Sequence, residues 1–389
     1  MNARSALFGR RVHIAGSISS DSNVASAANV DSARDLVAQL VERLLEKGAN
    51  FVVPVDAEKR RVSDDRPLCF DWLVWKTIND NLQKRPAEAQ GTLAIAVQHH
   101  KTEDQIPSEF VGLWDGLRAT DHVRIENAAQ WNMNSKRMEA QARYGDILIT
   151  LGGSEGVLFL ANLYHQAGKP VVPLNLPLEA ETTGSLKLHN FGLASNETRR
   201  LFRVVEGEDA HAWLNRIRFP SRQSTSDRVD ALLGLLEKLE RPTAFGVRLL
   251  NPKHPDFVDV EDFFSSVVRP VVEDELGYRL EIVDGEQPFE QARVDHEIFV
   301  KLHRSARVFA DLTGERSNCF LELGYALGRC VPLMVMAREG AELPFDITTL
   351  SGLRWKPIGD IEERRDAFRK HWTAIQNRPP LVDARPLIA

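Results

Sequence analysis

Short apolar runs that end at a polar or glycine-rich turn, and are followed by an amphipathic helix, recur along this chain and constrain its fold. In the first half, residues 11–15 and 51–55 are such runs, and residues 31–47 between them have apolar side chains at helical spacing. In the second half, residues 307–310 and 317–328 repeat the pattern. Strands that alternate with helices favour parallel sheets covered by helices. We therefore predict an α/β protein with two domains, each a mainly parallel sheet flanked by helices.

The middle of the chain contains the best candidate for a linker. Residues 219–227 are polar, with one proline and three serines. A leucine-rich amphipathic segment follows them, and its apolar face is also consistent with an oligomer contact. We predict a first domain over residues 1–218, a linker and bridging helix over residues 219–242, and a second domain over residues 243–389.

Composition excludes several classes of protein. The net charge is −6 and no basic tract stands out, which argues against nucleic-acid binding by phosphate neutralisation. No apolar run reaches the roughly 18 residues of a membrane span. The odd cysteine count (3) and the lack of metal-type spacing indicate a reduced, cytoplasmic protein without a bound metal. We expect a small-molecule ligand and neither a membrane nor a nucleic-acid partner.

The segment that begins at Asp311 has the strongest functional signal. Asp311 ends a predicted buried strand, and ligands of open α/β sheets bind outside the carboxyl ends of the strands. Asn318 and Glu322 are four residues apart on the following helix, so both project from one face. A carboxylate there can attack or stabilise an oxocarbenium-like sugar carbon. A solvated glutamate on a helix packed by leucines is the alternative, and spacing alone does not separate the two.

Residues 311–326 read Asp-Leu-Thr-Gly-x-x-x-Asn-x-x-x-Glu-Leu-Gly-Tyr-Ala. This segment resembles the TIR-like and nucleoside 2-deoxyribosyltransferase-like group of enzymes that cleave N-glycosidic bonds, and the likeness extends over residues 243–357. The resemblance implies that Glu322 is the catalytic carboxylate. The group usually has a Met-Pro-Phe-type sequence after its first strand, whereas this chain has Leu-Leu-Asn-Pro at residues 249–252. We therefore expect the edge of the substrate pocket formed by these residues to differ from that of the group.

Five residues of the second half are candidates for substrate binding. Arg248 lies in a predicted strand, where an arginine is costly unless paired, so it meets a substrate phosphate or pairs with Asp284 or Asp311. Asp311 accepts a substrate hydroxyl or caps the next turn. Asn318 bonds the ribose or caps its own helix. Asp284 ends a predicted strand, so it either faces the cleft or holds a turn. Phe345 belongs to a Leu-Pro-Phe-Asp segment that the resemblance includes.

Small-residue turns follow two predicted strands of the first half. Such turns allow backbone N–H groups to approach a phosphate at a helix N-terminus, although a simple turn is the alternative. The candidates for binding a nucleotide signal are Gly16, Ser17, Gly152, Gly153, Ser154, Glu155 and Gly156.

Together with the strand-like segment at residues 168–174, these turns resemble the SLOG superfamily, a Rossmann-like group that includes the LOG proteins, over residues 11–180. LOG phosphoribohydrolases have a glutamate pair on the helix after their glycine turn, whereas this chain has apolar residues at 157–160. We therefore expect no hydrolysis in this half. The resemblance implies a nucleotide sensor, as in SLOG domains joined to NAD-consuming antiviral effectors.

The two resemblances predict a protein of two Rossmann-like domains that acts as an N-glycosidase effector in antiphage defence. It would cleave the nicotinamide–ribose bond of NAD, its substrate, without a further cofactor. A nucleotide or a cyclic ADP-ribose-type ligand would activate it, and it would form a homo-oligomer. Two alternatives stay open: a nucleoside or nucleotide N-glycosidase or 2-deoxyribosyltransferase, and a non-enzymatic nucleotide sensor.

Overall fold

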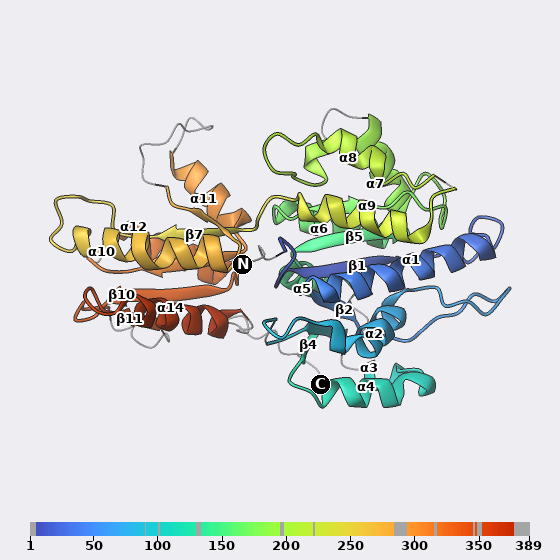
Figure 1. Ribbon diagram of the computed structural model, residues 1–389, viewed down its shortest axis with the longest axis horizontal. Helices are drawn as coiled ribbons and strands as arrows, with labels where there is room; N and C mark the ends of the chain where they lie inside the picture. The colour runs from blue at the N-terminus through green and yellow to red at the C-terminus, as the bar shows by residue number, and fades with distance from the viewer. Residues whose placement is uncertain are drawn as a thin grey trace. The chain divides into compact units, whose positions relative to one another are not determined.

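The computed structural model describes residues 5–89, 91–99, 102–129, 134–194, 198–220, 222–283, 294–314, 317–344, 347 and 352–376. The chain divides into two compact units, Met1–Glu240 and Arg241–Ala389. Each unit is built on a parallel sheet flanked by helices (Figure 1). The predicted fold class is confirmed. Among the described residues, no helix is both long and apolar enough to cross a membrane.

The sheet of the first unit has six parallel strands in the order β4-β3-β2-β1-β5-β6. Its strands are β1 (Arg11–Ser17), β2 (Asn50–Pro54), β3 (Ala94–His99), β4 (Val123–Ala129), β5 (Ile147–Gly152) and β6 (Val171–Pro173). Its helices are α1 (Ala27–Glu46), α2 (Asp71–Asp80), α3 (Thr102–Gln105), α4 (Val111–Arg118), α5 (Asn134–Tyr144), α6 (Glu155–Gln166), α7 (Gly184–Ala194), α8 (Ala210–Arg216) and α9 (Thr225–Glu237). The strand order reverses between β1 and β5, which is where open sheets of this kind bind ligands.

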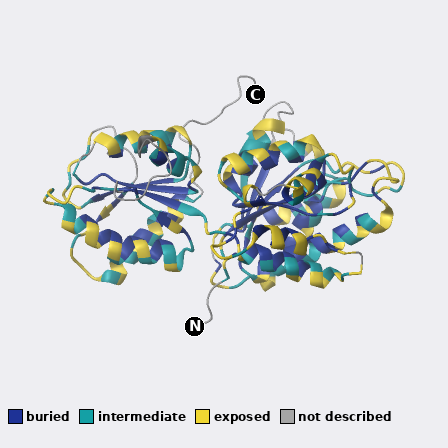
Figure 2. Ribbon diagram, turned by 90° about the horizontal axis from the view of Figure 1, so that it is seen from above, coloured by how far each residue is buried: buried dark blue, intermediate teal, exposed yellow. Residues whose placement is uncertain are grey.

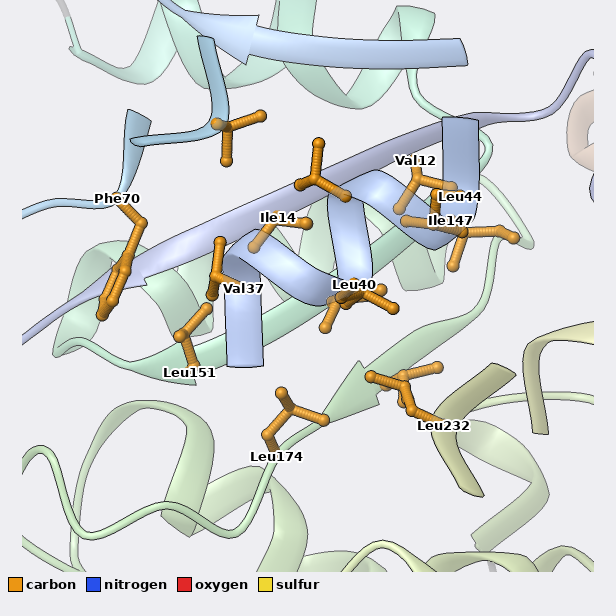
Figure 3. Packing of buried hydrophobic residues seen from close by; sticks show 14 of the residues in the cluster. Val12, Ile14, Val37, Leu40, Leu44, Phe70, Ile147, Leu151, Leu174 and Leu232 are labelled. Atoms are coloured by element: carbon orange, nitrogen blue, oxygen red, sulfur yellow. The ribbon is translucent and has the colours of Figure 1, made fainter. Parts of the chain in front are cut away.

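The core of the first unit forms where α1 covers the central strands. Apolar residues recur along α1 at helical spacing, so one stripe of the helix is buried. Val37, Leu40 and Leu44 of this stripe pack with Val12 and Ile14 of β1 (Figure 3). The strands of both units are buried, whereas the helices expose their outer faces (Figure 2).

The helix that we expect to bridge the domains is instead part of the first unit. The Ser224 hydroxyl caps α9 by accepting a hydrogen bond from the Asp227 N–H at 3.2 Å. Val229, Leu232 and Leu236 are buried in the same core as α1. Residues 219–242 are therefore not a free linker, and the boundary between the units falls after Glu240.

The sheet of the second unit has five parallel strands in the order β11-β10-β9-β7-β8, and its order reverses between β7 and β9. The strands are β7 (Thr243–Val247), β8 (Arg279–Glu281), β9 (Arg307–Asp311), β10 (Leu333–Arg338) and β11 (Gly352–Trp355). The helices are α10 (Phe257–Phe263), α11 (Val294–Arg304), α12 (Ser317–Gly328) and α14 (Ile361–Ile375). After α10 the chain continues as π-helical turns around Pro270, which lacks the N–H that a regular helix needs.

Candidate functional site

Glu322 lies on α12, beside the point where the strand order of the second unit reverses. The helix packs on β7 and β9. Glu322 is three residues after Cys319 and four before Ala326, both of which are buried, so its side chain leaves the helix beside the buried face. Glu322 itself is half-buried, whereas its neighbour Leu321 is 61% exposed. The carboxylate therefore lies at the border between the core and solvent, where it can meet a ligand.

The carboxylate of Asp311 holds the turn between β9 and α12. The side chain is fully buried; Oδ1 accepts a hydrogen bond from the Thr313 N–H at 2.9 Å and Oδ2 accepts one from Trp355 Nε1 at 2.5 Å. Burial raises the pKa of Asp311 to about 6, although both hydrogen bonds and the charge of Arg248 act in the opposite direction. Of the two roles expected for Asp311, this geometry fits the capping of the turn.

The rest of this turn is also fixed by its neighbours. The buried Thr313 hydroxyl accepts a hydrogen bond from the Arg338 N–H of β10 at 2.9 Å. Gly314 has φ of +81°, and a Cβ on it would lie 3.0 Å from the ring of His254, in the loop after β7. Residues 312–314 are therefore held between β10 and the loop after β7, at the carboxyl edge of the sheet. This support fixes the turn that follows β9, the strand on which α12 packs.

Arg248 differs from its expected environment. It follows β7 instead of lying within a strand, and its side chain is only 12% exposed. Its guanidinium forms an ion pair with Glu261 of α10 and lies 5.2 Å from the ring centroid of Phe264. Of the three alternatives expected for Arg248, the ion pair with Asp311 is not formed, because the helix that follows β7 brings Glu261 within reach, and Asp284 lies outside the described residues. The Arg248 carbonyl accepts a weak hydrogen bond from the Cys319 thiol at 3.7 Å, which links the end of β7 to α12.

The other candidates for substrate binding are less informative. Asn318 is exposed in the first turn of α12, on the same side of the helix as Glu322. Asp284 and Phe345 lie outside the described residues.

The structure brings together the two small-residue turns of the first unit. Ser17 pairs with Gly152, and the Gly153 N–H donates a hydrogen bond to the Ser17 carbonyl at 2.8 Å. Gly152 and Gly153 have φ of +56° and +72°, which favours glycine, and a Cβ on Gly153 would lie 2.3 Å from Val157. We call Gly16, Ser17, Gly152 and Gly153 the glycine rim. It lies at the reversal of strand order.

The N-terminus of α6 follows the glycine rim directly. Ser154 and Glu155 are exposed there, and Gly156 is half-buried. Sequence reasoning missed Gly184, which begins α7 with φ of +54° and lies against the rim. A Cβ on Gly184 would lie 1.8 Å from the Gly153 carbonyl oxygen, so only glycine allows this close approach.

Sequence reasoning also missed a group of charged side chains on the β2 side of the rim. Cys69 pairs with Ser17 immediately before α2, which begins at Asp71. Asp56, two residues after β2, forms an ion pair with Arg137 of α5. We call Asp56, Asp71 and Arg137 the acid–arginine cluster. The only feature of the sequence that could have indicated this cluster is the acidic residue after β2. In nucleotide-binding sheets an acid at this place often accepts hydrogen bonds from the ribose.

The sequence model of the family described as "ATP nucleosidase Cap17-like, N-terminal" matches residues 7–236. This match is more than half of the 389 residues and lies within the first unit. The chain belongs to this family. The Cap17-like match includes the glycine rim and the acid–arginine cluster, and its name describes an N-glycosidic hydrolase. It ends before the second unit, so the TIR-like resemblance of that unit stays a prediction.

The other comparisons add little to the Cap17-like assignment. A search of the curated proteins finds no match. Among solved structures, the X-ray structure of TM1055, a structural genomics target, matches with 16% identity and a TM-score of 0.27. The match covers 46% of this chain and 81% of that chain. We base no argument on a likeness at this TM-score.

Proposed function

We propose that this protein is a nucleotide N-glycosidase whose second unit carries out the reaction, with Glu322 as the catalytic carboxylate. The observation that carries the proposal is the position of Glu322: half-buried, on the helix that packs on both strands at the reversal of strand order. The family name supports the same reaction class. The buried bonds of Asp311 and Thr313 support it further, because a catalytic group needs a rigid mounting.

In the proposed reaction the bond between the ribose C1′ and the base nitrogen breaks, and its electron pair leaves with the base. The Glu322 carboxylate stabilises the positive charge that develops on the sugar, or forms an ester with C1′. Water then supplies the hydroxyl group at C1′. Its other proton goes to the departing adenine when ATP is cleaved, and to solvent when NAD is cleaved, because nicotinamide leaves as a neutral base. The products are adenine and ribose 5′-triphosphate from ATP, or nicotinamide and ADP-ribose from NAD.

Two substrates fit this chemistry. The family name favours ATP, which would release adenine. The TIR-like resemblance of residues 243–357 favours NAD, which would release nicotinamide. We place ATP first, because the family match covers more of the chain. A role for the glycine rim in binding an activating nucleotide, such as a cyclic ADP-ribose-type ligand, is part of the proposal, as are a homo-oligomeric state and a function in antiphage defence.

The test is base release by the purified full chain. ATP and NAD are supplied separately, with and without cyclic ADP-ribose, and free adenine and nicotinamide are separated by chromatography. We expect Glu322→Gln to lower the rate by roughly a thousandfold or more. Glu339→Gln, an exposed glutamate after β10 of the same unit, is the matched control and should retain the rate.

Equal rates for Glu322→Gln and the wild-type protein would refute the proposed role of Glu322. Saturable nucleotide binding without release of a base from either substrate would favour the sensor alternative.

A further inference from the structure

The acid–arginine cluster of the first unit has no part in the proposed cleavage. Asp56 follows β2, the strand next to β1, and its side chain is 29% exposed. Its Oδ1 accepts a hydrogen bond from the Ala57 N–H at 2.8 Å, and its Oδ2 pairs with Arg137. In open sheets that bind nucleotides, an acid after the strand adjacent to the glycine turn accepts hydrogen bonds from ribose hydroxyls. Asp56 occupies the corresponding place beside the glycine rim.

Arg137 connects Asp56 to α5, the helix that packs on α6. It lies on α5, with only 14% of its side chain exposed, and its Nη2 donates to the Asn134 amide oxygen at 3.3 Å. Its buried Nε has no hydrogen-bond partner among the described residues. The next residue, Met138, lies against α6, with its Cε 3.3 Å from a Cβ built on Gly156. Arg137 thus lies on the helix that packs on α6, and its Nε is left to donate to a ligand.

Asp71 gives the cluster a third polar group. Asp71 is half-buried at the first position of α2. Burial raises the pKa of Asp71 to about 7, the charges of Asp56 and Glu58 act in the same direction, and Arg137 opposes them. Near neutral pH a substantial fraction of Asp71 is therefore protonated and able to donate a hydrogen bond. The cluster thus combines a carboxylate acceptor, a cation and a neutral acid beside the glycine rim.

We propose that Asp56 binds the ribose hydroxyls of a ribonucleotide whose phosphates lie between the glycine rim and Arg137. Binding exchanges the Asp56–Arg137 ion pair for a carboxylate–hydroxyl bond and a guanidinium–phosphate bond. The first unit therefore distinguishes ribonucleotides from deoxyribonucleotides. This inference deepens the proposed function, because it rests on nucleotide binding by the first unit, but it does not depend on cleavage by the second.

The experiment uses the full chain with Glu322→Gln, so that no turnover disturbs the binding measurement. ATP and 2′-deoxy-ATP are titrated, and protection is followed by hydrogen-exchange mass spectrometry in peptides within residues 56–72, which report on the first unit alone. We expect ATP to give half of the maximal protection at a concentration about tenfold lower than 2′-deoxy-ATP does. The reason is that 2′-deoxy-ATP lacks the hydroxyl group that donates a hydrogen bond to the charged Asp56 carboxylate. Asp56→Asn should bring this ratio close to one. Arg137→Gln should weaken both ligands by about tenfold.

Two further variants keep the test decisive. Asp121→Asn, an exposed aspartate of the same unit, should retain the wild-type ratio. The double variant Asp56→Asn with Arg137→Gln removes both partners of the ion pair together, so it replaces Asp56→Asn if that variant does not fold. An unchanged ratio in the folded Asp56 variant, or no protection of this region by ATP, would overturn the inference. Base release by the wild-type protein is measured separately, so either proposal can fail while the other stands.

Discussion

Asp311 allows a quantitative test of the support beneath Glu322. The pKa of this carboxyl rises from 3.8 to about 6 on folding, mainly because the side chain is buried. Between these pH values the folded chain holds a proton that the unfolded chain has released. The stability contributed by this group is therefore complete below about pH 4 and is lost as the pH rises through about 6. The shift corresponds to about 3 kcal/mol.

The Asp311→Asn substitution removes this titration. An asparagine has one acceptor oxygen for two donors, the Thr313 N–H and Trp355 Nε1, so one donor loses its partner. At low pH the variant should be less stable than the wild-type protein by about 1–3 kcal/mol. As the pH rises the wild-type protein alone loses about 3 kcal/mol, so the difference should close or reverse.

Urea denaturation from about pH 4 to about pH 8 measures this difference, with unfolding of the second unit read by pulsed hydrogen exchange in peptides within residues 307–311. Asp274→Asn, at an exposed position of the same unit, is the control. A difference in the free energy of unfolding between Asp311→Asn and the wild-type protein that stays constant over this pH range would show that the buried carboxyl does not titrate as argued.

Two further substitutions test the packing. Gly314→Ala should destabilise the second unit by about 1–2 kcal/mol and slow base release, because it strains the backbone and meets the ring of His254. Gly340 has a similar φ but open space around it, so Gly340→Ala strains the backbone without meeting a neighbour. If both substitutions lower the stability in urea denaturation equally, the contact with His254 contributes nothing. Leu232→Ala should lower the stability of the first unit by about 3 kcal/mol, because this side chain is fully buried. The exposed Leu321→Ala is its control, and a thermal-melt effect of Leu232→Ala as small as that of the control would return α9 to the role of a linker.

The sequence predicted the central strands better than the edges of the sheets. β1, β5 and β9 are continuous apolar runs because helices cover both of their faces, and such runs are easily recognised. β4 and β11 were not predicted. Both are edge strands, where β4 interrupts its apolar residues with Arg, Glu and Asn and β11 has only four residues. Pairing with a neighbour decides the structure of these two strands, and their local pattern does not report it. The edge strand β6, by contrast, lies within the strand-like segment expected at residues 168–174.

In the candidate sites, too, the sequence indicates the relations between neighbouring residues better than the contacts between residues far apart in the chain. The structure brings the two small-residue turns named from the sequence together in the glycine rim, because parallel strands align their carboxyl ends at one edge of a sheet. The four-residue spacing placed Asn318 and Glu322 on one side of α12. By contrast, the pairing of Arg248 with Glu261 is not among the partners expected from the sequence, since it depends on how α10 returns over the sheet. The Asp56–Arg137 pair joins residues 81 positions apart and has no motif.

Both units combine a fixed turn with a carboxylate, but they support the carboxylate differently, and this difference argues for a division of labour. In the first unit Asp56 is held by Arg137, so a ligand must bring both a hydroxyl group and an anion to replace the pair. Such a site is selective for ligands that carry both groups. A positive charge that develops on a sugar there would be repelled by the Arg137 guanidinium. In the second unit the cation Arg248 is paired with Glu261 of the same unit. This pairing partly neutralises Arg248, and it is one reason why we propose cleavage for the second unit and recognition for the first.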